Sequence, residues 1–511
     1  MPRTVPPVHP RSPATPRRPY RAPRRSGGAL AVGVAVALLA VPVAADASSS
    51  SAHHPQRFET RPDLRPPGVR VLKTTDQATP GLTFVGPKRG PQKAQSGNMI
   101  FDSQGDLVYF DGSAGTKMDL RVQTLDGRPV LTWWEGKGFR GYGEGEGVIV
   151  DQQYREIGRV GTGNGIKADF HEFKLTDRGT ALLLGYKRQK RDLRSVGGSK
   201  NGWIMEGIVQ EVDVKTGKVV FDWRATRHVK LSESYHPVPK RRTVPFDFFH
   251  VNSVNLDGDG NYLVSARSTH TIYKLDRRTG KIIWRLGGKK PTFKHDRGTR
   301  TRWQHDVQRQ ADGTITIFDN NAHQAQTKLK ARGLQIRVDE QAKRVSLVRS
   351  YRRGATVFSP NQGNMQTTDT GNRLISWGGT IPFITELSPG GKVVWEARFS
   401  RKPTETYRAY RHAWNAQPTT RPKVAARRSG SRTAVRASWN GATTVHAWRV
   451  VAGADDATLA PTGQSARRGF ETLIVVPGHH ARIAVEALDA AGNVLSRSAS
   501  VAPTKSEYVR G

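Results

Sequence analysis

Three histidines occupy the same position of a repeated segment, and their side chains suit a site that binds or transfers an anionic group. His171, His250 and His305 each introduce a short apolar run, and a glycine follows each of them eight residues later. Equivalent positions of successive units face one axis in a radial repeat fold. The spacing therefore predicts that the three imidazoles surround a common volume.

The register of this repeat extends over five segments. Its opening residues and turn glycines are the pairs Gly97 and Gly105, His171 and Gly179, His250 and Gly258, His305 and Gly313, and Gly363 and Gly371. Three further histidines, His236, His270 and His323, fall outside the register. We therefore expect only the histidines within the register to face the axis.

Arg267 adds another basic group to this predicted site. It lies on the strand expected just past the His250 turn, where a side chain that faces the axis would join the histidines. Imidazolium and guanidinium groups donate hydrogen bonds to the oxygens of an anion, and arginine does so through a fixed fork. An imidazole also serves as a nucleophile or proton carrier near neutral pH, because its ordinary pKa is about 6.5. An ion pair between Arg267 and Asp247 is the structural alternative.

The composition favours many short strands joined by turns. The chain has 511 residues, with 52 glycines, 30 prolines and a formal net charge of +38. Such a charge attracts anions, from sulfated small molecules to anionic cell-surface polymers, whereas the sequence carries no motif typical of specific nucleic-acid recognition. Because cysteine is absent, the chain forms no disulfide, uses no thiolate and holds no metal through cysteine.

The first part of the chain is typical of an export signal. Residues 1–26 are rich in Arg and Pro, and an apolar stretch at 27–43 precedes small residues suited to cleavage. We expect residues 1–47 to form the signal, and the paired arginines favour the twin-arginine route. Because the apolar stretch is slightly short for a spanning helix of about 20 residues, we expect a secreted or cell-wall-associated protein without a stable membrane span. Residues 48–69 are expected to be a flexible lead-in.

A second repeated signal predicts the outer strands of the repeat. Turns followed by strand-like runs with an aromatic residue recur at 216–223, 279–284 and 390–396. Together with the inner segments, they predict an all-β chain in which residues 70–415 form a six-bladed β-propeller. A basic, turn-rich linker is expected at 416–432. Alternating short strands at 433–511 then predict a small β-sandwich, which resembles a fibronectin type III module.

Several segments are similar to signatures of the bacterial arylsulfate sulfotransferase family. The similarity covers roughly residues 70–415 and is carried by segments 80–85, 169–173, 249–254, 303–306 and 331–336, of which the three around the histidines are the most specific. It implies a six-bladed propeller that moves a sulfuryl group from an aryl sulfate donor to a phenolic acceptor through a sulfohistidine. It also implies that neither a nucleotide sulfate donor nor another cofactor takes part.

Carried over residue by residue, the resemblance makes His305 the nucleophile. His250 and Arg267 would bind the transferring oxygens and stabilise their charge. Asn252 would donate another hydrogen bond to those oxygens. His171 would bind the group or move protons on and off the phenolic oxygen.

Two alternative readings follow from the residues themselves. One is a non-catalytic secreted propeller that binds anionic or sulfated ligands in its channel, and the register of three histidines favours the enzyme over it. The other is a metal site. The oxygen-rich stretch at 257–261 lacks the ligand spacing of an EF-hand loop, and an arginine beside three histidines would repel a zinc ion. We therefore predict no metal site.

Overall fold

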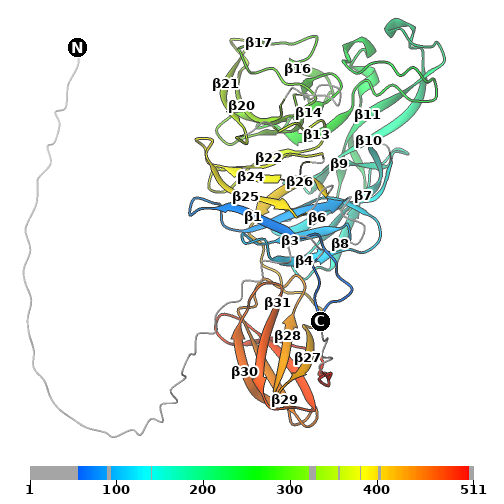
Figure 1. The fold of residues 1–511 in the computed structure, drawn as a ribbon. Coiled ribbons are helices and arrows are strands. Elements are labelled where there is room, and N and C mark those ends of the chain that lie inside the picture. Colours follow the sequence, from blue (N-terminus) through cyan, green and yellow to red (C-terminus); the bar gives the residue numbers. More distant parts are fainter. Residues whose placement is uncertain are drawn as a thin grey trace, which may run out of the picture. The chain divides into compact units, whose positions relative to one another are not determined.

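The computed structural model describes residues 56–505 apart from short gaps, and Figure 1 shows the chain. The gaps fall at 89–93, 140, 322–329, 355–356, 380, 382 and 401–403. The predicted export signal at 1–47 lies outside the described residues, and so does His323. No helix among the described residues is long and apolar enough to cross a membrane.

The described chain is built almost entirely from β-strands, which confirms the predicted all-β class. Its helical elements within the described ranges are three short 3₁₀ turns, η1 (Arg194–Val196), η2 (Ala225–Arg227) and η3 (Leu231–Glu233). Runs rich in Val, Ile, Thr and aromatic residues favour strands, because branched and aromatic side chains pack well on a pleated surface. Turns with Gly, Asp and Asn end these runs.

Five sheets form between residues 69 and 412. The first contains, in order, β26 (Glu405–His412), β2 (Leu82–Lys88), β3 (Asn98–Phe101) and β4 (Leu107–Asp111). The second contains β12 (Val219–Arg224), β11 (Gly202–Asp213), β10 (Thr180–Arg191), β9 (Ala168–Leu175), β7 (Tyr142–Val150), β6 (Arg128–Phe139) and β5 (Thr116–Leu125), with β8 (Glu156–Val160) paired to β7.

The other three sheets of this region each have four or five strands. The third contains β13 (Val251–Leu256), β14 (Tyr262–Ala266), β15 (Thr271–Leu275) and β16 (Ile282–Gly287). The fourth contains β17 (Lys294–His295), β21 (Arg344–Tyr351), β20 (Arg332–Asp339), β19 (Ile315–Asp319) and β18 (His305–Arg309). The fifth contains β1 (Val69–Thr74), β25 (Val393–Phe399), β24 (Phe383–Leu387), β23 (Arg373–Ser376) and β22 (Asn364–Thr367).

Six strands contact one another in a continuous series, which we call the inner strands. β5 contacts β9, β9 contacts β13, β13 contacts β18, β18 contacts β22, β22 contacts β26, and β26 contacts β5. The second sheet supplies two of them, since its β5–β8 and β9–β12 halves meet through the pair Gly145 and Ala168. Because the series returns to its starting strand, it brings side chains from distant parts of the sequence onto neighbouring strands.

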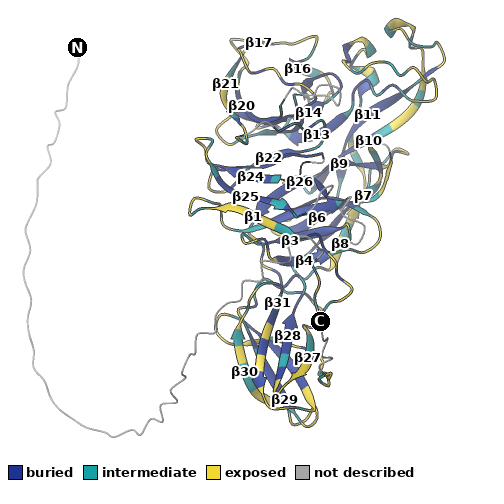
Figure 2. Cartoon of the chain, in the orientation of Figure 1, coloured by how far each residue is buried: buried dark blue, intermediate teal, exposed yellow. Residues whose placement is uncertain are grey.

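Late strands complete early sheets. β26 pairs with β2, which places His412 opposite Leu82, and β1 pairs with β25, which places Val69 opposite Phe399. β1 is exposed along most of its length, whereas β9, β13 and β26 are largely buried (Figure 2). Each pairing joins a strand from the start of the region to one from its end, so one edge of β2 and one edge of β25 are covered.

Residues 423–497 form two further sheets around a core of their own. The three-stranded sheet contains β27 (Lys423–Ser429), β28 (Arg432–Ser438) and β31 (Glu471–Pro477). The four-stranded sheet contains β30 (Ala460–Ala466), β29 (Ala447–Gly453), β32 (Arg482–Leu488) and β33 (Val494–Arg497). Val435 from one sheet and Trp448 and Val485 from the other are buried in the shared core.

Two expected irregular segments are ordered in the structure. β27 lies within the expected linker at 416–432 and pairs with β28 along its length. The sequence did not predict this strand, because its exposed basic side chains hide the strand pattern. In the expected flexible lead-in, the Thr60 hydroxyl donates a 2.6 Å hydrogen bond to Glu471 Oε1, and Leu64 is buried. The described part of the lead-in, from residue 56, is therefore packed against the rest of the chain.

One turn departs from the predicted register. The residue in the left-handed region after β13 is Gly260, with a φ of 79°, and not Gly258. Asp257 closes this turn by accepting a 2.9 Å hydrogen bond from the Gly260 N–H, and the repeated Asp-Gly sequence does not distinguish the two glycines. The left-handed glycines of the three equivalent turns are Gly179, Gly260 and Gly313, and the residues eight positions before them are His171, Asn252 and His305.

Candidate active site

His305 opens β18 with a defined tautomer. Its Nδ1 lies 2.6 Å from Asn320 Oδ1, and Asn320 Nδ2 donates to the Ser359 and Gln362 carbonyls at 3.0 and 3.1 Å. Because these donations turn the amide oxygen toward the ring, Nδ1 carries the hydrogen and Nε2 keeps its lone pair. The Gln362 N–H donates a 3.2 Å hydrogen bond to this Nε2.

The surroundings of His305 keep its imidazole neutral. Burial and the neighbouring positive charge of Arg267 hold the pKa of His305 well below its ordinary value, against the opposing effect of the Asn320 hydrogen bond. A neutral imidazole with an unprotonated Nε2 is a nucleophile once the Gln362 N–H, which donates to that nitrogen in this structure, gives way to the substrate. The geometry therefore gives His305 the form that covalent group transfer needs.

His171 and His250 form two carboxylate–histidine pairs that face each other. Asp247 Oδ2 lies 2.5 Å from His250 Nδ1, and Asp169 Oδ1 contacts His171 Nδ1. The two rings are 5.0 Å apart and nearly perpendicular, at 83°. A carboxylate on Nδ1 fixes the tautomer and supports an imidazolium, so that Nε2 is the atom that exchanges a proton. Burial lowers the pKa of His250, although Asp247 opposes the shift.

The backbone around the histidines is held in unusual conformations. His250, Trp303 and Asp306 lie in the left-handed region, with φ values of 47°, 57° and 49°. Non-glycine residues seldom adopt this region, and they do so most often where the surroundings fix them for function. The Asp306 carboxylate accepts a 2.9 Å hydrogen bond from the Met365 N–H, which helps to hold that backbone in place. His250 therefore combines a left-handed backbone with a position outside the turn register.

Arg267 reaches the same volume without forming the predicted alternative ion pair. Its Nη2 donates to the Pro360 carbonyl at 3.1 Å, and its guanidinium lies 4.9 Å from the centre of the Trp303 ring. Among the described residues its buried Nε has no hydrogen-bond partner. Asp247 is instead occupied by His250 and by the hydroxyl of Tyr142. A buried guanidinium without a bound carboxylate attracts an oxygen-rich anion.

Asn252 contacts the backbone beside the site. Its Nδ2 donates a 2.8 Å hydrogen bond to the carbonyl of Gln304, the residue before His305. Its own backbone carbonyl accepts a 3.2 Å hydrogen bond from Arg408. Within the described chain Oδ1 of Asn252 is buried without a partner. In this arrangement Asn252 holds the backbone next to His305, and one of its two amide hydrogens is already engaged.

A buried ionic cluster, which the sequence did not indicate, supports the inner strands below the histidines. Arg408, on β26, donates to Glu172 Oε1 at 2.9 Å and to the backbone carbonyls of His171 and Asn252 at 3.0 and 3.2 Å. Arg121 adds a second cation 2.7 Å from Glu172. Burial would raise the pKa of Glu172, but Arg408 and Arg121 lower it to about 2. The cluster therefore joins three inner strands through a carboxylate that stays ionised.

Aromatic side chains surround the paired histidines. The Phe170 ring stacks on His171 with centres 4.4 Å apart, and Tyr142 and Tyr186 lie 5.9 and 6.0 Å from His250. Burial raises the pKa of both tyrosines, so they remain phenols. Aromatic faces at these distances suit a flat, apolar substrate group.

The sequence reasoning excluded two histidines that the structure places beside the site. His236 lies 6.4 Å from the Trp303 ring, and His270 lies 4.5 Å from it. Both sit outside the strands, so no strand register marks them. The pairs Asp-x-His at 169–171 and Asp-x-x-His at 247–250 are short sequence signals that would have identified the carboxylate partners.

The oxygen-rich stretch at 257–261 is a turn whose carboxylates are already paired. Asp257 contacts Arg309 at 2.5 Å and Lys274 at 3.0 Å, and Asp259 contacts Lys274 at 2.8 Å. In the described part of the chain, no group of three or more His, Asp or Glu residues has the arrangement of a metal site.

These contacts bring His171, His250, His305 and Arg267 together on an all-β scaffold. The family model described as Arylsulfotransferase (ASST) matches residues 121–400, which is more than half of the chain. The chain therefore belongs to the arylsulfotransferase family, and the resemblance in its histidine segments is confirmed at the level of the family.

Solved structures give only remote similarities. A Bacteroides caccae protein of unknown function is 14% identical, covers 65% of this chain and 98% of its own, and has a TM-score of 0.40. A virginiamycin B lyase from Staphylococcus aureus is 8% identical, covers 72% and 94%, and has a TM-score of 0.32. No curated protein sequence matches the chain. Similarities of this size carry no argument about the site.

Proposed function

We propose that this protein is a secreted arylsulfate sulfotransferase that moves a sulfuryl group from an aryl sulfate to a phenolic acceptor through a sulfohistidine on His305. The observation that carries the proposal is the neutral imidazole of His305, whose Nε2 carries no proton and accepts a hydrogen bond from the Gln362 N–H. Beside it lies Arg267, a guanidinium with no carboxylate partner among the described residues. Membership of the arylsulfotransferase family supports the reaction class.

In the first step, His305 Nε2 attacks the sulfur of the donor. The N–S bond forms as the S–O bond to the aryl group breaks, and the electron pair leaves on the phenolic oxygen. Protonated His171, stabilised by Asp169, donates its Nε2 proton to that oxygen. Arg267 and His250 bind the sulfuryl oxygens and stabilise their charge.

In the second step, the acceptor phenol replaces the departed one. His171 Nε2 takes the phenolic proton while the oxygen attacks sulfur, and the N–S electron pair returns to His305 Nε2. The two steps are mirror images, so the same residues serve both. A role for Asn252 in binding the oxygens remains part of the proposal, through a rearrangement of its amide.

The proposal is tested with 4-nitrophenyl sulfate as donor and phenol as acceptor. We expect nitrophenol release that depends on phenol, and, without phenol, a gain in intact mass equal to one SO₃ group. Anisole, the methyl ether of phenol, has no phenolic hydroxyl, serves as the matched control acceptor and is expected to leave the adduct intact. Absence of both release and adduct across a panel of donors and acceptors would favour a non-catalytic protein that binds anionic ligands.

The lowered pKa of His305 predicts how adduct formation depends on pH. An ordinary histidine loses its free lone pair as the pH falls through about 6.5. Because the pKa of His305 lies well below that value, its Nε2 stays available, and the rate of adduct formation is expected not to fall in this range. Single-turnover rates with 4-nitrophenyl sulfate between about pH 5 and 8 provide the measurement. A loss of rate on acidification, with a midpoint near pH 6.5, would contradict it.

The same proposal includes the architecture that carries the site. The returning series of six inner strands, each belonging to a group of four strands or more, supports a closed six-bladed β-propeller over 70–415. The two sheets of three and four strands at the end of the described chain support a fibronectin type III-like module.

Export remains a proposal from the sequence. The basic and apolar residues at 1–47 support a cleaved signal, with the twin-arginine route as the expected one. The net charge of +38 supports association with an anionic polymer of the cell wall after secretion.

A further inference from the structure

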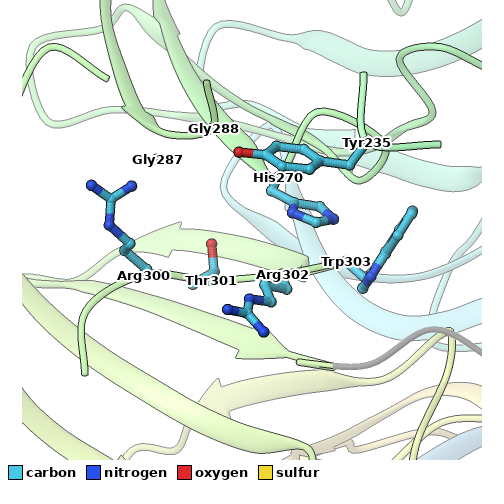
Figure 3. Close-up of a pocket in the computed structure, with 8 residues that line it drawn as sticks. All are labelled: Tyr235, His270, Gly287, Gly288, Arg300, Thr301, Arg302 and Trp303. Atoms are coloured by element: carbon cyan, nitrogen blue, oxygen red, sulfur yellow. The ribbon is translucent and has the colours of Figure 1, made fainter. Parts of the chain in front are cut away.

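A cavity of about 340 Å³ lies beside the candidate active site and has no role in the mechanism above. It is bordered by the end of β16 and by the segment that leads into β18 (Figure 3). Pockets of a few hundred Å³ hold a single small ligand. Trp303 borders the cavity and also contacts the Arg267 guanidinium, at 4.9 Å from ring centre to Cζ. The cavity therefore adjoins the histidine site through one shared side chain.

One side of the cavity is a wall of aromatic rings. Tyr235 stacks on His270 with centres 4.2 Å apart and planes within 5°. Trp303 meets His270 edge to face, at 4.5 Å and 74°. Figure 3 shows the three rings grouped on one side, with Arg300 across the cavity from them. Rings in this arrangement present flat and edge-on surfaces to a further aromatic ring.

The opposite side of the cavity is basic. Arg300 and Arg302 border it, and neither guanidinium forms an ion pair within the part of the chain that the structure describes. On the aromatic side, Lys289 lies outside the residues that border the cavity, with its Nζ 5.0 Å from the Tyr235 ring and held by the Ser232 and Ser234 carbonyls. Among the described residues that border the cavity, none is acidic. The charge is therefore available to an anion that enters.

Gly287 and Gly288 form the remaining wall of the cavity with their backbone. Gly288 has a φ of 71°, and a Cβ on it would lie 2.0 Å from Thr271 Oγ1. Only glycine fits there without displacing β15. The cavity wall at this point is consequently backbone, and its shape does not depend on a mobile side chain.

From this combination, we propose that the cavity binds an aromatic ring that carries an acidic group. The ring lies against Tyr235, His270 and Trp303, and the acid faces Arg300 and Arg302, as charge-assisted hydrogen bonds to a guanidinium favour. This ligand is a second, unreacting part of an extended donor or acceptor, and that identity rests on the proposed sulfotransferase function. Binding in the cavity does not depend on that function.

The binding step is tested by calorimetry with three probes and no donor present. Benzoate offers a ring and an acid, acetate an acid alone, and benzyl alcohol a ring alone. We expect benzoate to bind on the order of tenfold more tightly than either of the others. The variant R300Q/R302Q is expected to weaken benzoate binding on the order of tenfold, and Y235A to weaken benzoate and benzyl alcohol but not acetate.

The matched control is R277Q/R297Q, which removes two positive charges from exposed positions of the same region that do not border the cavity. It is expected to leave the affinity unchanged within about twofold, because distant exposed charges are screened. Equal binding of benzoate and acetate, equal loss in both double variants, or no benzoate binding would each overturn the assignment. Benzoate binding without sulfuryl transfer would leave the cavity assignment intact and remove the proposed function, and transfer without benzoate binding would do the reverse.

Discussion

Replacing His305 with alanine is expected to remove the sulfuryl adduct and to lower the rate of transfer on the order of 10⁴-fold or more. The side chain supplies the atom that forms the covalent bond, and no other histidine of the site has its protonated nitrogen fixed by an amide rather than by a carboxylate. Donor binding should persist, because Arg267 and His250 are unchanged. Intact mass after incubation with donor alone and steady-state nitrophenol release provide the two readings.

A matched variant separates loss of the nucleophile from loss of a histidine in general. His479 is exposed in a turn after β31, with its Nε2 2.8 Å from the Gly430 carbonyl. H479A is expected to transfer at the rate of the unaltered protein. H305Q keeps the volume of the ring and guards against a packing defect, and it should be as inactive as H305A. An adduct that survives in both His305 variants would move the nucleophile to His171 or His250.

The fold class was readable from the sequence because strand and turn signals are local. Alternating branched residues, separated by Gly and Asp turns, mark most inner and outer strands without knowledge of their partners. The pairing of β26 with β2 is different. It joins residues more than three hundred positions apart, and no local pattern at 405–412 identifies its partner. β27 was missed for a local reason, since its basic residues resemble a solvated linker.

The site was predictable only in part, for reasons that differ between its residues. His171 and His305 follow the turn register, so the repeat alone identifies them. His250 was selected through Gly258, although the structural turn residue is Gly260, and it reaches the site through its own left-handed backbone. Asn252, and not His250, occupies the register position. Tertiary contacts such as that between Asn320 and His305 have no counterpart in a single sequence.

Replacing Arg408, in the ionic cluster around Glu172, with methionine is expected to lower the stability of the protein strongly. Arg408 is fully buried, with no exposed side-chain surface, and it neutralises Glu172 and lies 3.4 Å from Asp119. Methionine has similar length but would leave an ionised carboxylate with Arg121 as its remaining close cation. Removing one partner of a buried pair costs about 3–5 kcal/mol, and we expect this loss in the free energy of unfolding, measured by denaturant titration at neutral pH.

The pH dependence of the loss distinguishes this cause from a simple packing defect. Since the folded pKa of Glu172 is about 2 and its ordinary value is 4.5, the pairing stabilises the protein above the ordinary value and ceases to do so as the pH falls toward 2. The difference in the free energy of unfolding between R408M and the unaltered protein should therefore shrink on acidification, whereas a cavity penalty would persist.

R344M is the control variant. It removes an arginine whose side chain is 59% exposed and paired with Asp296, and it should cost no more than about 1 kcal/mol. In R408M/E172Q the uncompensated charge is absent, so part of the lost stability should return. Equal losses of unfolding free energy in R408M and R344M, or no recovery in the double variant, would contradict charge compensation at Glu172 as the source of the stability.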